Sequence, residues 1–374
     1  MDITLKEVKS RRDLKEFIFL PEKIHSGRKN WVHPIYMDEW AYFNPKKNKA
    51  FSYSDTLMLL AVRGNELVGR IMGIINRRYN ELRGEETGRF GYLESYENPD
   101  VVPVLLNAVE EWARERKMTK VIGPYGFTDQ DPEGFLIEGF ENRATIATYH
   151  NYEWMPGRVE QQGYTKDVDY YVYQLDIPKE FPEFYKKIYE RVKRKGNYDV
   201  VEFRKKKEIK PWIVPVLQLM NECYTASNIY GYTPLDETEM KELAKRYLPV
   251  LDPRLVKAVK AEKELVAFIV GIPDMTEGIQ KARGRLFPLG FLKILRAAKK
   301  TKQLDLLLGA IKESYRGRGL DVLMGVKMIM SAQDAGLEVM DTHHELESNV
   351  LVRREMEKMG GKLYKRFRVY RKNL

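Results

Sequence analysis

The stretch that decides the fold is an apolar run followed by a glycine-rich turn, Leu306-Leu307-Leu308-Gly309-Ala310-Ile311-Lys312-Glu313-Ser314-Tyr315-Arg316-Gly317-Arg318-Gly319-Leu320. The apolar run predicts a strand over 304–311, and the periodicity beyond Gly319 predicts a helix over 320–335. Such a glycine-rich connection turns consecutive backbone N–H groups toward one point, where the helix dipole adds positive charge. Arg316 and Arg318 add two full charges, so the turn is a candidate site for a pyrophosphate.

The order of strands and helices around this turn occurs twice along the chain. In the first half we expect strands over 56–63, 66–76, 89–94, 120–122 and 167–175, and helices over 101–117 and 154–162. In the second half we expect strands over 255–261, 264–272, 304–311, 337–341 and 363–370, and helices over 320–335 and 350–359. We therefore predict an α+β protein of two repeated units, 1–178 and 179–374, each a mixed, mostly antiparallel sheet flanked by helices.

The composition fits a folded, basic chain. Its 374 residues exceed what one hydrophobic core usually serves, and 64 Lys and Arg residues against 54 Asp and Glu residues favour an anionic partner. The single cysteine, Cys223, excludes an intrachain disulfide framework and a zinc site with several thiolates. No apolar run reaches the ~18 residues that would span a bilayer. The first residues lack the apolar core of a secretion signal, so we expect a cytoplasmic protein.

The residues that follow the turn add a second motif. Asn349 precedes a predicted helix that ends in Glu357-Lys358-Met359-Gly360, and a strand follows. Together with Tyr315-Arg316-Gly317-Arg318-Gly319-Leu320, this series resembles the GNAT superfamily of acyl-CoA N-acyltransferases, from about residue 300 to the end. The family's hallmark is a strand that runs into Arg/Gln-x-x-Gly-x-Gly/Ala at a helix start. The two-unit layout is similar to a bacterial subgroup with tandem GNAT units.

The resemblance implies a cofactor, acetyl-CoA or another acyl-CoA, and a reaction in which an amine attacks the thioester directly. The backbone of the turn would hold the pyrophosphate, the strand edge would pair with the pantetheine arm, and Asn349 would hydrogen-bond that arm. A backbone N–H of the strand would polarise the thioester carbonyl. The cofactor-binding residues implied are Gly309, Ala310, Ile311, Arg316, Gly317, Arg318, Gly319, Leu320 and Asn349.

Two positions depart from the family pattern. Asp321 stands where Gly or Ala is usual, and a carboxylate near a pyrophosphate is unfavourable unless it points away. Met356 stands where an aromatic residue usually protonates the leaving thiolate, and a thioether has no proton to give. Either Tyr364 or Tyr315 then supplies the proton, or catalysis is weak or lost.

Candidates for the general base follow the two strands that border the predicted acyl site. Glu313 lies just beyond the strand over 304–311, and His343 follows the strand over 337–341, within the series His343-His344-Glu345-Leu346-Glu347. Side chains that alternate on an extended segment point in opposite directions, so we expect no metal site at the two histidines. The predicted catalytic residues are Glu313, His343 and Tyr364.

The first half has no comparable turn. Its equivalent segment, 94–100, contains three acids and no glycine, so it should not bind CoA. The segment 123–135 contains acids, aromatics and glycines and is either a pocket for a cationic amine or an irregular loop. The segment 280–302 contains eight Lys and Arg residues, no acid and interleaved apolar residues. This basic amphipathic insert is either a connecting helix with a buried apolar face, a lid, or a membrane-surface contact.

We therefore predict an N-acyltransferase with a small-molecule or peptide amine as acceptor. The alternatives are a tandem GNAT protein that binds CoA with weak or no turnover, a transferase that uses aminoacyl-tRNA, and a membrane-associated protein that acts through 280–302. Nucleic-acid binding is not expected, because no array of aromatic residues accompanies the basic clusters. A monomer is favoured over a dimer, because tandem units would bury the surface through which a single GNAT domain dimerises.

Overall fold

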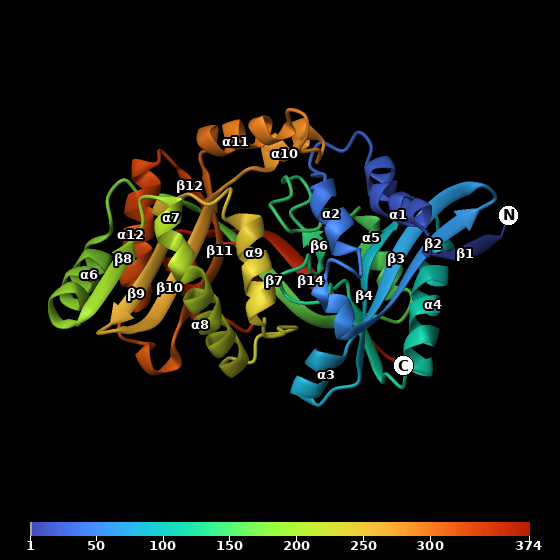
Figure 1. Cartoon of the computed structure of the whole chain (residues 1–374), viewed down its shortest axis with the longest axis horizontal. Coiled ribbons are helices and arrows are strands. Elements are labelled where there is room, and N and C mark those ends of the chain that lie inside the picture. The colour runs from blue at the N-terminus through green and yellow to red at the C-terminus, as the bar shows by residue number, and fades with distance from the viewer. Residues whose placement is uncertain (1) are drawn as a thin grey trace.

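One mixed sheet runs through the whole molecule (Figure 1). The computed structural model describes residues 2–374, apart from the side chain of Lys195. The strands are β1 (Ile3–Glu7), β2 (Ser54–Arg63), β3 (Glu66–Asn76), β4 (Thr87–Ser95), β5 (Lys120–Gly123), β6 (Phe135–Glu138), β7 (Thr165–Asp176), β8 (Tyr198–Glu202), β9 (Val256–Ala261), β10 (Glu264–Pro273), β11 (Gln303–Ile311), β12 (Val339–Asp341), β13 (Glu345–Leu346) and β14 (Lys362–Asn373).

The helices cover both faces of this sheet. They are α1 (Arg11–Ile24), α2 (Tyr36–Tyr42), α3 (Arg77–Arg83), α4 (Val101–Glu115), α5 (Trp154–Glu160), α6 (Glu183–Lys195), α7 (Lys206–Ile209), α8 (Ile213–Ala226), α9 (Glu237–Tyr247), α10 (Thr276–Ala282), α11 (Gly290–Lys300), α12 (Leu320–Asp334) and α13 (Val350–Lys358). Short 3-10 turns add η1 (Lys49–Ser52), η2 (Lys210–Trp212), η3 (Pro253–Leu255) and η4 (Glu313–Tyr315). None of the helices in the part of the chain described is long and apolar enough to cross a membrane.

The predicted α+β class and the order of strands and helices are confirmed. The predicted helix over 320–335 is α12, and the predicted strand over 304–311 is β11. Among the residues described, parallel pairing is confined to two places, β4 with β5 and β11 with β12, one in each half. All other ladders are antiparallel, as the alternation of apolar residues in short strands predicts.

The last strands of the two halves are exchanged. The order across the sheet is β1-β2-β3-β4-β5-β14-β7-β12-β11-β10-β9-β8. Strand β7 belongs to the first half of the chain but pairs with β12, whereas the C-terminal β14 pairs with β5. The two exchanged strands pair with each other at the centre, from Lys362 opposite Gln174 to Arg371 opposite Thr165. Strand pairing therefore crosses the boundary at 178/179 in both directions and joins the units into one sheet.

In the second half, helices cover opposite faces of β10 and β11. Helix α8 shares an apolar cluster with Phe268 and Leu308, which point to one face. Helix α12 shares a cluster with Ala267 and Ile311, which point to the other. Alternate residues of each strand thus pack against different helices. The helices on both faces also contribute residues to a cavity beside β11.

The basic insert forms a helical hairpin, α10 and α11, between β10 and β11. Its inner face carries Ile279, Ala282 and Ile294, which are buried in an apolar cluster. Its contacts reach the first half, because Gln280 Nε2 donates to the carbonyls of residues 29 and 31, both at 2.8 Å. This inner side agrees with the first of the three alternatives from the sequence, a connecting helix with a buried apolar face.

Candidate functional site

The sheet opens between β11 and β12. Their parallel ladder ends after Asp305 pairs with Asp341. Beyond this point the chain after β12 stays with β7, where the N–H of Thr342 donates to Tyr173 O at 3.0 Å. Strand β11 instead follows β10, with a bulge that leaves Leu307 without a register partner. The two strands therefore diverge and leave part of β11 free to pair with another extended molecule.

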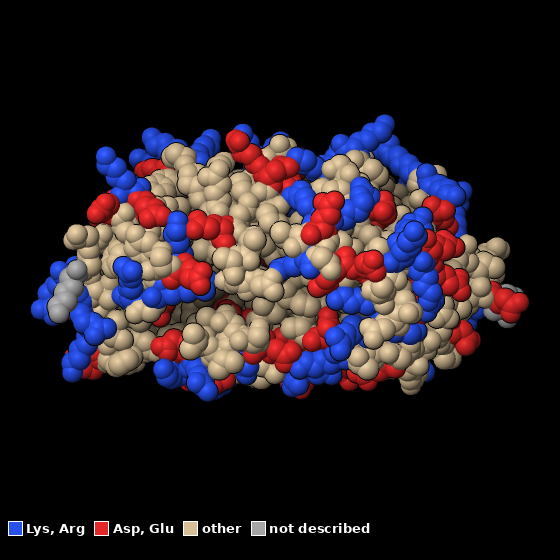
Figure 2. Space-filling view, turned by 90° about the horizontal axis from the view of Figure 1, so that it is seen from below, with Lys and Arg blue, Asp and Glu red and all other residues tan. Residues whose placement is uncertain are grey.

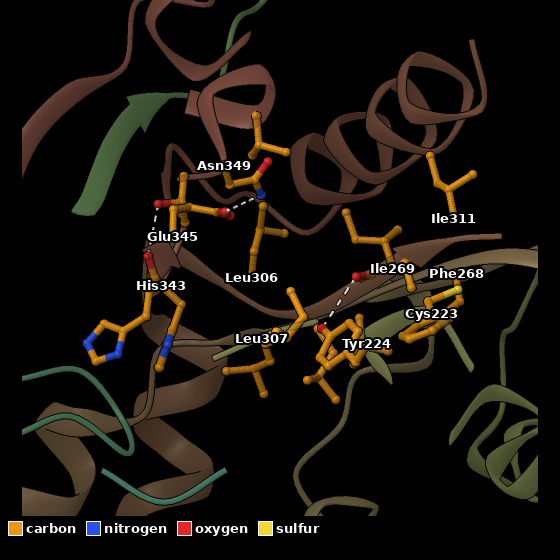
Figure 3. A pocket seen from close by; sticks show the side chains of 18 of the residues that line it. Cys223, Tyr224, Phe268, Ile269, Leu306, Leu307, Ile311, His343, Glu345 and Asn349 are labelled. Atoms are coloured by element: carbon orange, nitrogen blue, oxygen red, sulfur yellow. Dashed lines mark hydrogen bonds between the residues drawn. The ribbon is translucent and has the colours of Figure 1, made fainter. Parts of the chain in front are cut away.

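A cavity of about 1200 Å³ occupies this opening. Its walls come from both helix layers, because it is lined by Leu217 and Leu243 of α8 and α9 and by Met324 and Met356 of α12 and α13. Figure 3 shows one region of it, with Glu345 and Asn349 on one side and Tyr224 on the other. The apolar lining of the α8 and α9 side comprises Phe203, Ile209, Trp212, Ile213, Val216, Leu217, Leu243, Leu248, Leu251, Val256 and Val270.

The glycine-rich turn lies at one end of this cavity. Gly317 and Gly319 have φ angles of +70° and +82°, a conformation in which glycine is strongly favoured. Within the residues described, no acceptor is recorded for the N–H groups of residues 317–320, which precede and begin α12. The side chain of Arg316 donates to Ile311 O at 3.2 Å and to Ser227 Oγ at 2.7 Å, which fixes its position.

The two glycines meet different surroundings. A Cβ at Gly319 would lie 2.7 Å from a methyl group of Val192 on α6, so this glycine is needed for helix packing. A Cβ at Gly317 would meet no heavy atom within 4 Å. Free N–H groups, the start of a fifteen-residue helix and the Arg316 guanidinium together form a cradle that fits a pyrophosphate. Asp321 lines the same cavity, and its carboxylate opposes this charge.

The structure gathers most of the predicted cofactor-binding residues around one space. Gly309, Ala310, Ile311, Arg316, Gly317 and Asn349 line the cavity. Arg318 points to the surface, with its guanidinium 5.0 Å from the ring centre of Tyr315. Leu320 is buried in the core between α12 and β9. The side chain of Leu320 is therefore not available to a ligand in the cavity.

The predicted catalytic residues are dispersed. Glu313 is exposed in η4 and is not among the cavity residues. Tyr364 also lies outside the lining, and its hydroxyl donates to Asp341. The other tyrosine proposed from the sequence, Tyr315, donates to Glu264 at 3.3 Å. Both phenols thus donate to carboxylates, and neither tyrosine lines the cavity.

His343 lines the cavity, but its environment makes it a poor base. Its Nε2 donates to Ile146 O at 2.9 Å, and burial lowers the pKa of the ring to about 4. Its backbone N–H donates to Asp341 at 2.7 Å, in a turn where φ is +57°. This turn breaks the extended geometry expected for the segment, so the expected opposite orientation of the two histidines is wrong. The rings of His343 and His344 lie 5.2 Å apart.

Glu345 is the carboxylate best placed to act as a base. It lines the cavity, and its Oε2 accepts a hydrogen bond from Asn349 Nδ2 at 3.4 Å. Burial raises the pKa of Glu345 to about 7. A base with this pKa is partly ionised near neutral pH and binds a proton strongly enough to take one from an amine. Glu345 lies two residues after His343 in the sequence. Only the fold shows that burial lowers the pKa of His343 and raises the pKa of Glu345.

Tyr224 of α8 faces the same region, and no motif in the sequence indicated it. Its hydroxyl donates to Gly309 O at 3.4 Å (Figure 3). Burial raises the pKa of this phenol, and the nearby carboxylates of Asp129 and Glu345 raise it further. Tyr224 therefore stays protonated and lies within electrostatic range of both acids, beside the open strand.

The acidic loop of the first half forms the other wall. Asp131 is occupied in holding the loop, since it accepts from Tyr42 and from the N–H of residue 127. Asp129 lines the cavity, and its Oδ1 has no hydrogen-bond partner among the residues described. Burial raises the pKa of Glu133 to about 8, and its carboxylate accepts from Tyr170 at 2.9 Å. These acids present hydrogen-bond acceptors to a polar or cationic group in the cavity.

Solved structures share the fold of this chain. A tandem GNAT protein from the clavulanic acid biosynthesis pathway matches 100% of this chain and 98% of its own, with a TM-score of 0.56 and 11% identity. The chain has a tandem GNAT fold. A GCN5-related N-acetyltransferase from Sphaerobacter thermophilus matches 99% of this chain and 95% of its own, with a TM-score of 0.51 and 13% identity. The resemblance inferred from the two motifs of the second half is thereby confirmed at the level of the fold.

Two curated proteins are similar along almost the whole chain. One, named bacterial ceramide synthase, from Caulobacter vibrioides, is 29% identical over 382 aligned positions, covering 100% of this chain and 98% of its own. The other, named protein YghO, from Escherichia coli, is 24% identical and covers 98% of this chain and 94% of its own. No family model matches the chain.

Proposed function

We propose that this tandem GNAT protein is an N-acyltransferase that moves a long acyl chain from acyl-CoA to the amine of an amphiphilic acceptor. The observation that carries the proposal is the cavity of about 1200 Å³, with apolar walls on the α8 and α9 side. The pantetheine arm would lie at the opening beside β11, and an acetyl group would leave the apolar chamber on the α8 and α9 side empty. The similarity to a protein named ceramide synthase favours the same substrate class, because a ceramide is an N-acylated long-chain amino alcohol.

The donor would bind on the side of the cavity that α12 and α13 line. The N–H groups of residues 317–320 and the Arg316 guanidinium would hold its pyrophosphate. The free edge of β11 would pair with its pantetheine arm, opposite Asn349. Acyl-CoA supplies an activated thioester, and the N–H of Leu307, at the bulge, would polarise its carbonyl.

The acceptor would bind between the acidic loop and the apolar chamber. The carboxyl groups of Asp129 and Glu133 would hydrogen-bond its amino and hydroxyl groups, and Asp129 has an oxygen without any partner in the residues described. The apolar walls of α8 and α9 would cover hydrocarbon and exclude water from the thioester. An amphiphile matches this combination of a polar wall and a long apolar chamber.

Two side chains would move the protons. The acceptor's ammonium group would first release one proton to solvent. The neutral amine nitrogen would then form a bond to the thioester carbon, and Glu345 would take the second proton that the nitrogen loses. The carbon–sulfur bond breaks, and Tyr224 gives a proton to the sulfur. Met356 stands where the proton donor is expected, but a thioether has no proton to give. Tyr224 would give the proton instead, and its hydroxyl contacts Gly309 on β11. Asn349 would keep Glu345 in place.

The test is a turnover assay with a series of donors and one long-chain amino alcohol. The purified chain is incubated with acetyl-, octanoyl-, palmitoyl- or stearoyl-CoA and sphinganine, and the N-acyl product is measured by mass spectrometry alongside release of free CoA. We expect the long-chain donors to give the highest kcat/KM. A clear preference for acetyl-CoA would overturn the chain-length assignment.

A second candidate is a protein that binds acyl-CoA without turnover, and Met356 and Asp321 favour it. In that case long-chain acyl-CoA would raise the unfolding temperature through ligand linkage. No product would then form with sphinganine or with a panel of other amines. If neither binding nor transfer is observed in folded protein, both candidates fail.

A further inference from the structure

The outer side of the α10–α11 hairpin exposes large apolar side chains. We call residues 276–302 the basic hairpin. At its turn, Phe287 is 78% exposed, Leu289 60%, Phe291 41% and Leu292 59%. Such residues scattered singly are ordinary on a protein surface, but four within six consecutive positions form a patch. The inner side is already buried through Ile294, so this patch is a second, outward apolar face.

Basic side chains surround this patch. Between residues 281 and 302 the chain has eight Lys and Arg residues and no acid. Three of them pair with acids elsewhere, Lys281 with Glu277, Arg285 with Glu22 and Lys302 with Glu338. For the other five, no ion pair occurs among the residues that the structure describes; these are Arg283, Lys293, Arg296, Lys299 and Lys300.

No acid lies within 281–302 to offset the charge of the hairpin. Helix α11 lies along the upper edge of the molecule in Figure 1. Figure 2 shows the molecule from below, and there Lys and Arg side chains are interspersed with Asp and Glu side chains. A mixed surface has little attraction for a polyanion, whereas uncompensated cations next to an apolar patch are complementary to anionic headgroups above hydrocarbon.

The hairpin also lies over the cavity. Ile279 and Ile294 of its inner face share one apolar cluster with Ile146, Leu251 and Leu307. These last three residues line the cavity. The inner face of the hairpin therefore packs against residues that line the cavity.

We propose that the basic hairpin docks this protein on an anionic phospholipid bilayer. Phe287, Leu289, Phe291 and Leu292 insert into the boundary between headgroups and acyl chains, while the five unpaired cations contact phosphate groups. The docking stands on the exposed patch and its charges alone. Its use, which is to bring lipid substrates to the cavity below, rests on the proposed function.

The experiment is sedimentation of the full-length protein with sucrose-loaded vesicles. One set contains phosphatidylcholine with phosphatidylglycerol, and the other contains phosphatidylcholine alone. We expect binding to the anionic vesicles that falls as salt is raised. The variants Phe287→Ser/Leu292→Ser and Lys293→Glu/Arg296→Glu/Lys299→Glu should each lower the partition coefficient by about tenfold or more.

Matched controls come from other exposed positions. Phe184→Ser/Leu82→Ser removes apolar residues that are 61% and 46% exposed elsewhere. Lys186→Glu/Lys187→Glu/Arg194→Glu reverses three exposed charges of α6. Both controls should bind vesicles as the unchanged chain does, and unfolding curves check that every variant is folded.

Two outcomes would overturn the proposal. The first is a wild-type chain that does not sediment with anionic vesicles, or controls that lose as much binding as the hairpin variants. The second is a wild-type chain that does not bind vesicles but forms a dimer in size-exclusion chromatography. If Phe287→Ser/Leu292→Ser dissociates that dimer, the patch is a protein interface. Because the assay needs no substrate and no turnover, a failed docking test leaves the proposed acyl transfer standing, and the reverse also holds.

Discussion

Replacing Glu345 by Gln tests the catalytic assignment most directly. The amide keeps the shape of the side chain but has no basic oxygen. A positioned general base usually contributes roughly 10²–10⁴-fold, so kcat/KM for the long-chain donor should fall by at least about 100-fold. In the unchanged protein, kcat/KM should fall about tenfold for each pH unit below the pKa of Glu345, about 7. The residual activity of Glu345→Gln should lack this dependence.

The same substitution should stabilise the fold at neutral and higher pH. The folded pKa of Glu345 lies above its ordinary value of 4.5, so the folded state binds more protons than the unfolded state between pH 4.5 and about 7. Stability is therefore lost as pH rises through this window. A shift from 4.5 to about 7 corresponds to about 3 kcal/mol. Because the side chain is only partly buried, we expect about 1–2 kcal/mol.

The assay combines pH-dependent kinetics with urea unfolding at pH 5 and pH 8. The control is Glu347→Gln, two residues away, since Glu347 contacts Lys166 and the N–H of residue 169 and does not line the cavity. This control should keep its activity within about twofold and retain the acidic limb of the profile. The reasoning fails if Glu345→Gln remains active with an unchanged pH profile. It also fails if that variant is less stable than the unchanged protein at pH 8.

Three further substitutions test other parts of the site. Gly317→Ala, at φ +70° with no atom within 4 Å of the new Cβ, should cost about 1–2 kcal/mol of stability and weaken CoA binding about tenfold or more by calorimetry. Gly336→Ala is the control, because Gly336 is equally open at φ +72° but lies outside the cavity. It should lose a similar amount of stability and keep its affinity for CoA. Tyr224→Phe should lower kcat about tenfold or more without changing the Kd for CoA, whereas Tyr315→Phe should not. Ala244→Phe, in the apolar chamber, should shift the preferred donor to shorter acyl chains in the turnover series.

The elements around the glycine-rich turn were predictable because their signals are local. The apolar run over 304–311 and the helix over 320–335 follow from periodicity and from the glycines that stop one element and begin the next. The identity of the cavity-lining positions Gly309, Arg316 and Asn349 followed from the resemblance, which depends on the same local motif.

The catalytic assignments were harder because proximity and burial are not local. Glu313 adjoins β11, but η4 turns this residue outward to solvent. Glu345 acquires its raised pKa only through burial among segments that are distant in sequence. Tyr224 lies on an apolar helix, and nothing in its neighbours distinguishes it from a core residue until β11 is placed beside it.

The sequence by itself determined the elements around the glycine-rich turn and the order of strands that recurs in the two halves, because backbone conformation and apolar periodicity are properties of neighbouring residues. Only the tertiary structure decided that β7 and β14 exchange places, since both strands alternate alike and either would pair with β5 or β12. It likewise decided which acids and phenols meet at the open edge of β11. The reason is physical: strand partners and buried charges are selected by free energies of contacts between distant segments, which no single segment contains.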